Sequence, residues 1–577
     1  RKGARAALIT TKGFRDVLEM RRRDRLNTWG LWGNFVPVIE RDMRFEVDER
    51  VLADGTVLRT LDPAEVRQIA VKALEAGAES IAVVFINSYA NPANELAAMD
   101  AIRAVWPNRN IACSSQILPE IREFERTSTV ALNAYLQPVV GGYLDKLKGA
   151  LEGENFRSCF HIVQSNGGVM STETASRLPV RTALSGPAAG VIAAAEIAKA
   201  AGYPNIITGD LGGTSFDVSL VVNGQAALAA QTTIDFGLVV RTPMIEITTI
   251  GAGGGSIAHV DAGGLLQVGP ESAGSRPGPV AYGLGNTRPT LTDANIVLGR
   301  INVERPIGGK LARLDVDAAR DAIEAHVARP FGIGVMEAAE AIVRVADARM
   351  AGAIRLVSIE RGHDPADFVA VPFGGGGALH AGALIKDVGL KAALVPRYPG
   401  VTSALGCVIA DIRHDQVQTI NATTETLDIE SFGRRMVAEA MGTLQVVGNA
   451  GLQVDRIDVL FELDMHYVGQ THTIAVPLPI LLDEVPGKLS RDLIQAAFEK
   501  TYQASFSRLL PGQQAKIVNL RTVAIGRRPH FDLKALAPQQ TGTAKDALTG
   551  RRQVWFDGAW HDTAIYARLD LPVGAEI

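Results

Sequence analysis

Acidic, hydroxyl and glycine residues lie close together in GDLGGTSFD, residues 209–217. Apolar, β-branched runs flank this stretch, and an Asn-Gly pair after the second run predicts a hairpin. We therefore expect Gly212, Gly213 and Thr214 in a tight turn between two antiparallel strands. Glycine lets backbone N–H groups approach an anion, and the hydroxyls of Thr214 and Ser215 add donors. This chemistry favours a phosphate-binding turn.

Asp210 and Asp217 flank these glycines. Like charges repel, so neither carboxylate suits direct contact with a phosphate. Both suit a metal-bound water or the orientation of a nucleophile. No Gly-Lys-Ser or Gly-Lys-Thr follows, which excludes a P-loop. The alternative interpretation is a glycine-rich hairpin with surface aspartates.

A second glycine cluster follows an apolar, strand-like run in FVAVPFGGGGALHAGAL, residues 368–384. Its glycines Gly374, Gly375, Gly376 and Gly377 lead into a predicted helix. Such a turn lets a flat ligand or a phosphate approach the helix N-terminus closely. The alternative is a tight strand-to-helix turn without a ligand.

Other motifs give weaker signals. Leu379 stands where the third glycine of the dinucleotide-binding fingerprint would fall, so that spacing is absent. His380 lies beside the loop, and a hydrogen-bonded structural histidine is its default interpretation. The histidine pattern contains no His-Glu-x-x-His. The clusters at 164–168, 184–190 and 251–255 favour loops, with ligand contact as the alternative.

Composition narrows the class of protein. The chain has 577 residues, 47% hydrophobic and 21% charged, with a net charge of −4. This length favours roughly two to four domains. The charge balance predicts no nucleic-acid partner, and no run reaches the ~18 apolar residues of a membrane helix. Cys113, Cys159 and Cys407 are widely spaced, which favours a reducing cytoplasm over a disulfide framework.

Longer patterns predict the elements that position these motifs. Strand-like and helical segments alternate up to about residue 110, which predicts parallel strands with crossover helices. Residues 120–150 are helical, with Pro138 expected to kink or divide the helix. A polar segment at 419–428 marks an expected domain boundary. Beyond it the sequence alternates like a β-meander around a helix at 490–509.

The two glycine sites, in this order, resemble those of the acetate kinase/sugar kinase/Hsp70/actin superfamily. In that fold a hairpin loop of the type Asp-x-Gly-Gly-Thr grips phosphates. A strand-Gly-Gly-helix element cups the adenosine. GDLGGTSFDVSLV and FVAVPFGGGGALHA look like these two elements.

Longer motifs narrow the resemblance to the hydantoinase A/5-oxoprolinase family, which includes subunits of acetone and acetophenone carboxylases. They run in order along nearly the whole chain and include EFERTSTVALNAYL, QSNGGVMS, RTALSGPAAGVIAA, TIGAGGGSIA, PTLTDANIVLGR and PGVTSALGCVIADIRHD. The segment NTWGLWGNFVPVIERDMRFEV resembles the ketone-carboxylase side of the family.

The resemblance implies an α/β fold with a duplicated ribonuclease H-like (actin/Hsp70-type) ATPase core and an additional mixed α+β C-terminal domain. Residues 1–115 would be the remainder of an N-terminal domain. Residues 116–418 would form the ATP-binding core, and residues 425–577 a β-rich C-terminal domain. Because the chain starts at Arg1 without Met, inside a patterned segment, we expect a piece of a longer polypeptide.

The resemblance also implies a function. Family members transfer the γ-phosphoryl group of ATP, with Mg²⁺ or Mn²⁺, to the carbonyl oxygen of a cyclic amide such as hydantoin, 5-oxoproline or a lactam. A hydantoinase B-like partner completes the ring-opening hydrolysis. We therefore expect an enzyme subunit in a cytoplasmic hetero-oligomer that acts on a small molecule. Neither nucleic acid nor membrane is an expected partner.

Residue roles follow from the same resemblance. The expected phosphate contacts are Gly212, Gly213, Thr214 and Ser215. Asp210 would hold the metal ion or its water, and Asp217 the loop or the outer shell of the metal. The glycines at 374–377 would cup the nucleoside. The substrate-side candidates are His380, Asp293 and Asn295.

Three departures from the family pattern stand out. A first phosphate loop usually lies upstream of ARAALITTKGF and is missing here, so the fragment should lack half of the nucleotide clamp. Val280 replaces a common cysteine, and Thr248 stands where histidine is frequent. Three other readings remain open at this point: a ketone carboxylase subunit, an Hsp70/actin-like nucleotide switch, and an inactive scaffold subunit.

Overall fold

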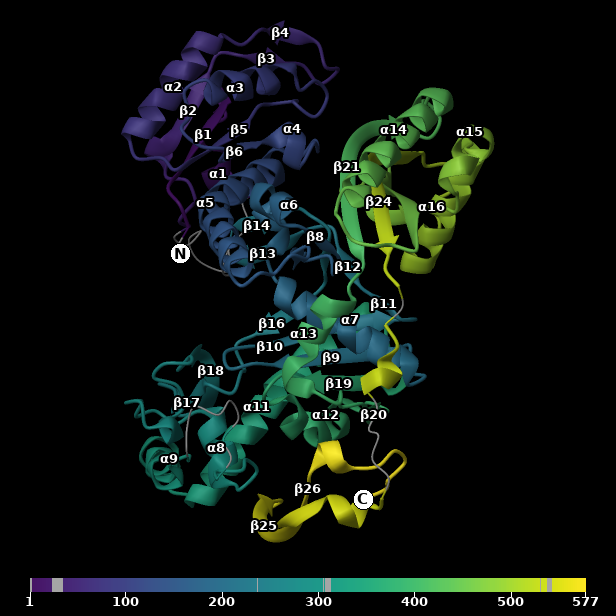
Figure 1. The fold of residues 1–577 in the computed structure, drawn as a ribbon. Coiled ribbons are helices and arrows are strands. Elements are labelled where there is room, and N and C mark those ends of the chain that lie inside the picture. Colours follow the sequence, from purple (N-terminus) through teal and green to yellow (C-terminus); the bar gives the residue numbers. More distant parts are fainter. Residues whose placement is uncertain are drawn as a thin grey trace. The chain divides into compact units, whose positions relative to one another are not determined.

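The computed structural model describes residues 3–22, 35–235, 237–304, 306, 313–529, 531–536 and 542–577 (Figure 1). Part of the tryptophan-rich segment that resembles the ketone carboxylases, residues 27–34, lies outside the described residues. The chain divides into two compact units. Unit 1 comprises residues 1–185, 228–244 and 410–529, and unit 2 comprises residues 186–227, 245–409 and 530–577.

Unit 1 begins with a parallel sheet in the order β2-β1-β5-β6. Its strands are β1 (Ala6–Thr11), β2 (Arg44–Val47), β5 (Ser80–Val84) and β6 (Ile111–Cys113). The helices α2 (Pro63–Glu75) and α3 (Ala93–Arg103) connect successive strands. This confirms the parallel strands and crossover helices predicted for the first 110 residues.

The longest helix of unit 1, α5 (Glu123–Gly153), contains Pro138 without being divided by it. Proline lacks the N–H that would bond the carbonyl four residues earlier. That carbonyl, on Ala134, instead accepts a hydrogen bond from the hydroxyl of Ser80 at 2.6 Å. Pro138 therefore does not divide the helix, because a side chain on β5 satisfies the carbonyl that proline leaves free. The expected kink stays a prediction.

A second sheet of unit 1 runs in the order β23-β22-β24-β21-β8-β7. Its strands are β7 (His161–Val163), β8 (Val169–Ser171), β21 (Ile412–Thr423), β22 (Arg456–Tyr467), β23 (Ile474–Pro477) and β24 (Ala515–Arg527). The helices α14 (Ile429–Gly448) and α16 (Arg491–Phe506) pack on it and share its apolar core. The predicted strands and the intervening helix are confirmed, but the predicted meander is wrong, because β24 pairs with β22 on the side opposite to β23.

Unit 2 is built on a sheet in the order β11-β10-β9-β19-β20, with β16 paired to β10 (Figure 1). Strands β9 (Ile206–Leu211) and β10 (Phe216–Val222) are antiparallel, whereas β19 (Val369–Phe373) runs parallel to β9. The remaining strands are β11 (Gln225–Ala226), β16 (Thr248–Ile250) and β20 (Ala392–Ala393). The predicted hairpin at GDLGGTSFD is confirmed.

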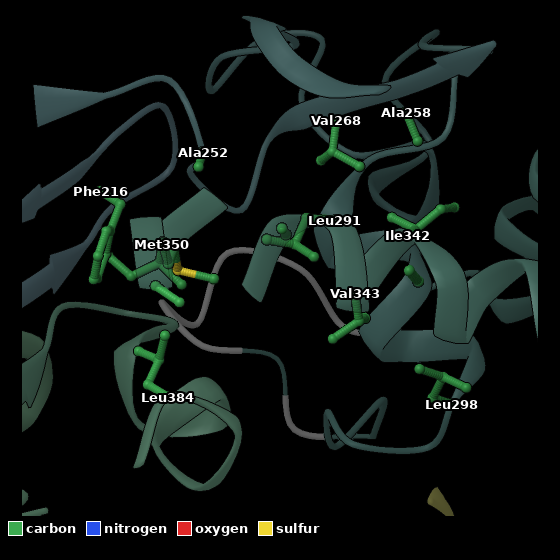
Figure 2. Packing of buried hydrophobic residues seen from close by; sticks show 14 of the residues in the cluster. Phe216, Ala252, Ala258, Val268, Leu291, Leu298, Ile342, Val343, Met350 and Leu384 are labelled. Carbon is green, nitrogen blue, oxygen red and sulfur yellow. The ribbon is translucent and has the colours of Figure 1, made fainter. Parts of the chain in front are cut away.

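Four helices bury their apolar faces against this sheet and against a hairpin of two further strands. The helices are α8 (Leu291–Val297), α9 (Val316–Ile323), α11 (Val335–Val357) and α12 (Ala381–Val388), and the hairpin is β17 (Ser256–Val260)/β18 (Leu266–Ser272). Figure 2 shows the side chains of Phe216, Leu291 and Met350 in that apolar cluster. Phe216 immediately precedes Asp217, so the core fixes the strand that carries an acidic side chain.

The C-terminal hairpin β25 (Leu548–Phe556)/β26 (Ala559–Tyr566) also belongs to unit 2. Trp555 donates from its backbone N–H to Leu298 O at 2.9 Å and from Nε1 to Glu340 Oε2 at 3.1 Å. The α/β class predicted from the sequence is confirmed, and the boundaries 1–115, 116–418 and 425–577 stay predictions. Among the described residues, every helix is too short or too polar to cross a membrane.

Candidate functional site

The turn between β9 and β10 lies at the exposed end of the hairpin in unit 2. Gly212 N–H donates to Ser215 O at 3.1 Å and closes the turn. Within the described part of the chain, the N–H groups of Gly213, Thr214 and Ser215 have no acceptor. Gly212, Gly213 and Thr214 are exposed. The turn can therefore offer backbone donors to an anion. Phosphate binding by this turn stays a prediction.

Asp210 and Asp217 are directly opposite each other in the ladder of β9 and β10. Burial raises the pKa of Asp210 to about 6, and the negative charge of Asp217 adds to this. Burial also raises the pKa of Asp217, although hydrogen bonds from Thr249 and Ser215 oppose it. A cation placed beside the pair would stabilise both carboxylates in their ionised form and so lower both pKa values.

Thr249 on β16 fixes the orientation of Asp217. Its hydroxyl donates to Asp217 Oδ1 at 2.6 Å, and the Ser215 hydroxyl donates to Oδ2 at 3.3 Å. The strand register aligns Thr249 with Asp217, and Asp217 with Asp210. Asp217 is thus held by its neighbours, whereas Asp210 has no side-chain donor among the described residues. The sequence analysis missed Thr249, because strand register is not visible in the sequence.

The glycine cluster at 251–255 packs against the turn and hydrogen-bonds to it. Gly254 N–H donates to Gly212 O at 2.9 Å, and Gly255 N–H donates to Gly213 O at 2.6 Å. A Cβ on Gly253 would lie 2.5 Å from the carbonyl carbon of Thr214, which no real side chain tolerates. The close packing of this cluster against the turn therefore explains why it contains glycines.

Asp293 is buried at the start of α8, where it completes a capping box with Thr290. Its carboxylate accepts hydrogen bonds from Val280 N, Ala281 N, Thr290 N and Thr290 Oγ1, at 2.8–3.0 Å. Asn295, two residues further along α8, is also buried and donates to Leu291 O at 3.1 Å. The neighbouring Thr292 anchors the supporting loop, because its N–H and hydroxyl both donate to Gly254 O at 2.8 Å.

The glycines at 374–377 follow β19 and lie against the end of β9. Gly374 has φ +81°, and a Cβ there would lie 2.4 Å from Asp210 Oδ1. Gly376 N–H donates to Leu211 O at 3.3 Å. Gly375 is exposed, with open space where a side chain would project. The structure thus places the second glycine cluster directly beside the acidic residue of the first.

His380 is buried at the end of the second cluster, just before α12. Its Nδ1 lies 2.6 Å from Oδ1 of Asp347, a buried residue of α11. This contact joins the glycine loop to the helix behind it. The sequence analysis missed Asp347, because it is one of several charged residues in this helix and the sequence gives no sign that it is buried.

These residues fit a nucleotide and a divalent cation. The turn has free backbone donors for phosphates, and the open side of Gly375 leaves room for a flat group. No group of three or more metal-binding side chains occurs among the described residues. Mg²⁺ is commonly held by one or two carboxylates together with phosphate oxygens. Asp210 and Asp217 supply such a pair.

Comparison with known proteins covers the entire chain. Residues 126–416 match the hydantoinase/oxoprolinase family, residues 1–106 its N-terminal region and residues 439–577 its C-terminal domain. The caprolactamase subunit alpha of Pseudomonas jessenii is 34% identical over 99% of this chain and 82% of its own length. The acetophenone carboxylase gamma subunit of Aromatoleum aromaticum is 33% identical over 98% of this chain and 80% of its own length.

Solved structures agree with these relatives. The crystal structure of ATP-dependent caprolactamase from Pseudomonas jessenii has a TM-score of 0.80 at 31% identity, over 98% of this chain and 82% of that one. A nucleotide-free structure of acetone carboxylase, described in terms of ATP-dependent acetone carboxylation, has a TM-score of 0.78 at 27% identity, over 100% of this chain and 84% of that one. The chain therefore belongs to the hydantoinase/oxoprolinase family, as its motifs predicted.

Proposed function

We propose that the chain is an ATP-dependent enzyme subunit that phosphorylates the carbonyl oxygen of a cyclic amide for ring-opening hydrolysis. The observation that carries this proposal is the convergence of three features at the ends of β9 and β19. They are the exposed donor turn, the carboxylate pair and the second glycine loop. The names of the caprolactamase and 5-oxoprolinase relatives support an amide substrate.

The fold gives this proposal a structural frame. We propose that the sheet of unit 2 is one half of a duplicated ribonuclease H-like core, because an antiparallel hairpin followed by parallel strands carries the turn. The parallel sheet at the start of unit 1 would belong to the other half.

Each residue of the site has a role that its contacts support. The N–H groups of Gly213, Thr214 and Ser215 bind phosphate oxygens, and the loop around Gly375 holds the nucleoside. Bound ATP supplies the phosphoryl group, and Mg²⁺ or Mn²⁺ would neutralise its charge. Asp210 binds the cation or orients its water.

The remaining candidates position these groups. Asp217, held by Thr249 and Ser215, keeps its carboxylate beside Asp210. We propose a supporting role for Asp293, because four donors already occupy its carboxylate. His380 fixes the end of the nucleoside loop through Asp347. Positioning and charge neutralisation together account for most of the catalysis in phosphoryl transfer.

A partner subunit completes the proposal. The caprolactamase and acetophenone carboxylase relatives are both named as subunits, which supports a hetero-oligomer. The expected partner is hydantoinase B-like and hydrolyses the activated amide. Its active site would lie outside this chain.

A ketone carboxylase subunit is the second candidate function. The acetophenone and acetone carboxylase relatives support it, since their similarity also spans the chain. In that reaction a ketone enolate is phosphorylated and then carboxylated. The same nucleotide site serves both chemistries, because each needs phosphorylation of a carbonyl oxygen.

One assay separates these candidates. ATP hydrolysis by the complex of the full-length protein with its partner is measured with a lactam, and separately with a ketone plus hydrogencarbonate. Stimulation by the lactam alone supports the amidohydrolase, and stimulation by the ketone mixture supports the carboxylase. Stimulation by unfolded peptide instead would favour an Hsp70-like switch. No ATP binding at all would favour a scaffold subunit and end both proposals.

A further inference from the structure

One further loop lies against the turn between β9 and β10. It consists of residues 273–279, which directly follow β18. Ala273 N–H donates to Gly255 O at 2.9 Å, and Gly255 N–H donates to Gly213 O at 2.6 Å. The hydroxyl of Ser272, the last residue of β18, lies 3.5 Å from the same oxygen of Gly213. The start of the loop is therefore held next to the turn.

The other end of the loop is fixed as well. Gly278 N–H donates to Ala273 O at 3.1 Å and closes the loop, while Gly278 O accepts from Asn286 Nδ2 at 2.8 Å. Directly after Pro279, two successive backbone N–H groups donate to the buried carboxylate of Asp293, at 3.0 and 2.9 Å. A loop that is closed and anchored at both ends presents its tip in a defined position.

The tip of the loop carries donors that the protein does not use. Ser275 and Arg276 are both exposed. Within the described part of the chain, neither backbone N–H has an acceptor, and the guanidinium of Arg276 has neither a hydrogen bond nor an ion pair. Successive free N–H groups in a turn are a common anion-binding arrangement. The tip therefore combines such donors with a positive charge.

The tip is close enough to reach an anion at the turn. A Cβ on Gly255 would lie 2.8 Å from Gly213 O and 3.6 Å from Gly274 N, so the loop and the turn are in close contact there. Arg276 follows Gly274 by two residues, a span of at most about 7 Å. The long side chain of arginine can cover this span, so its guanidinium can reach a phosphate that the turn binds.

The carboxylates around this loop do not neutralise Arg276. Glu271 is already paired with Arg288, whose Nη1 lies 2.8 Å from Glu271 Oε2. The carboxylate of Asp293 is occupied by its four donors. Asp210 and Asp217 at the turn form no ion pair with a described arginine or lysine. The charge of Arg276 thus remains available to a ligand.

The site described so far has no cationic side chain. The segments GDLGGTSFD, GAGGG and GGGG, which form the turn and its two neighbouring glycine loops, contain neither lysine nor arginine. Phosphoryl transfer spreads negative charge over the oxygens of the transferred group, and enzymes neutralise it with metal ions together with lysine or arginine. Arg276 is an unpaired cation on a loop that hydrogen-bonds to this site, so it meets the requirement.

We propose that Arg276 is a catalytic residue that binds the terminal phosphate of ATP, with the backbone N–H groups of the loop tip as further donors. The inference rests on the proposed function and adds the side chain that stabilises the transferred group. The planar guanidinium can donate two parallel hydrogen bonds to phosphate oxygens. The turn at Gly213–Ser215 then binds the oxygens on another side of the phosphate chain.

Arg276 takes no part in the bond changes of this step. The carbonyl oxygen of the amide supplies the electron pair of the new bond to the γ-phosphorus. The electron pair of the broken bond stays on the β-phosphate oxygen of the leaving ADP, and the amide N–H proton passes to water. Because a guanidinium keeps its proton throughout, Arg276 acts only by stabilising the negative charge on the transferred phosphoryl group.

Calorimetric titration of the full-length protein in complex with its partner tests the proposal. The probes are ADP and the non-hydrolysable ATP analogue with a β,γ-imido bridge, each with Mg²⁺. Arg276→Gln should weaken binding of the ATP analogue about tenfold or more and leave ADP affinity unchanged, because ADP has no terminal phosphate for Arg276 to bind. Equal loss of affinity for both nucleotides, or no change for either, overturns the proposal.

Two further variants separate a direct role from a general effect of charge. Arg276→Lys keeps the charge without the planar fork, so it should retain part of the preference for the ATP analogue. Arg320→Gln is the matched control, because Arg320 on α9 is also exposed and has no ion pair within the described part of the chain. If Arg320→Gln changes the preference as much as Arg276→Gln does, the assignment is wrong.

Steady-state turnover at saturating ATP gives a second readout. Arginines that stabilise a transferred phosphoryl group accelerate the reaction by about a thousandfold or more, so Arg276→Gln should lose about that factor. A higher KM for the amide or ketone, with kcat and both nucleotide affinities unchanged, would place Arg276 on the carbonyl substrate instead and overturn the proposal.

These measurements also separate this inference from the proposed function. If the wild type turns over ATP with a lactam or a ketone and Arg276→Gln does the same, the inference fails while the proposed function stands. If the nucleotide preference depends on Arg276 but no carbonyl compound stimulates turnover, the proposed function fails while the phosphate contact stands. A wild type that binds no nucleotide overturns both.

Discussion

Asp210 and Asp217 show how one residue type takes two roles in adjacent strands. Three neighbouring strands align Asp210, Asp217 and Thr249, and hydroxyl donors hold only the middle carboxylate. Asp210 has no such donor among the described residues, so its charge remains available to a cation. This division cannot be read from the sequence, where the two aspartates look equivalent.

We predict that Asp210→Asn abolishes ATP turnover but stabilises the protein without ligand at neutral pH. Burial and Asp217 raise the pKa of Asp210 to about 6, so its ionised form is unfavourable in the folded state. The gain should be about 1–2 kcal/mol after allowance for partial exposure. Thermal unfolding in nucleotide-free buffer measures it, with Asp455→Asn at an exposed position as the control.

The pH dependence of this gain follows from the direction of the shift. A raised pKa means that the folded protein binds a proton more readily than the unfolded chain between about pH 4 and 6. The wild type therefore loses stability as pH rises through this window, and the advantage of Asp210→Asn grows until it levels off above it. An advantage that is constant from pH 4 to 8 would contradict the assignment.

At the scale of elements, the site is a turn held in place by two loops that hydrogen-bond to it or to each other. The loop at 251–255 donates two backbone hydrogen bonds to the turn, and Thr292 at the start of α8 donates two hydrogen bonds to that loop. Three of the sequence motifs thus form one layered support. Each motif was visible in the sequence, but the hydrogen bonds between them were not, because these bonds join segments about 40 to 80 residues apart.

We predict that Gly253→Ala weakens ATP binding by displacing the turn. The added Cβ would lie 2.5 Å from Thr214, so the turn must move. A displacement of about 1 Å near a reacting group can cost about a hundredfold in rate. Fluorescent nucleotide binding and steady-state turnover are the measurements.

Gly352→Ala is the matched control for this change. Gly352 lies within α11, and open space surrounds the position of its Cβ. Alanine there should raise stability by about 1 kcal/mol through its helix propensity, with ATP affinity unchanged. If Gly253→Ala binds ATP as the wild type does, the support role of the loop is wrong.

At the scale of the whole molecule, the chain alternates between its two units. Each unit contains three separate segments of the sequence, so the chain passes between them five times. Local patterning predicted the parallel strands, the hairpin turn and the strands beyond residue 428, since those depend on nearby residues. The sheet that joins β7 and β8 to β21 depends on pairing across more than 200 residues, and no local pattern encodes it.

We predict that deletion of residues 542–577 loosens unit 2 and leaves unit 1 intact. The deleted hairpin supplies the two hydrogen bonds of Trp555 and the buried Val554. Hydrogen exchange followed by mass spectrometry should show faster exchange in α8 and α11, with β22 and β24 unchanged. Trp555→Phe serves as a milder control that removes only the bond from Nε1 to Glu340. Equal loosening of both units would contradict the division.

The segmented build of unit 1 also has a consequence for synthesis on the ribosome. Strand β8 ends at Ser171, and its sheet partner β21 begins at Ile412, 241 residues later. At about 5–20 residues per second, that interval lasts on the order of tens of seconds. During this time the newly made β7 and β8 have an open edge that a neighbouring nascent chain could pair with. Slow codons or chaperone binding in this interval would therefore affect the yield of folded protein more than the same events after β24 has been made.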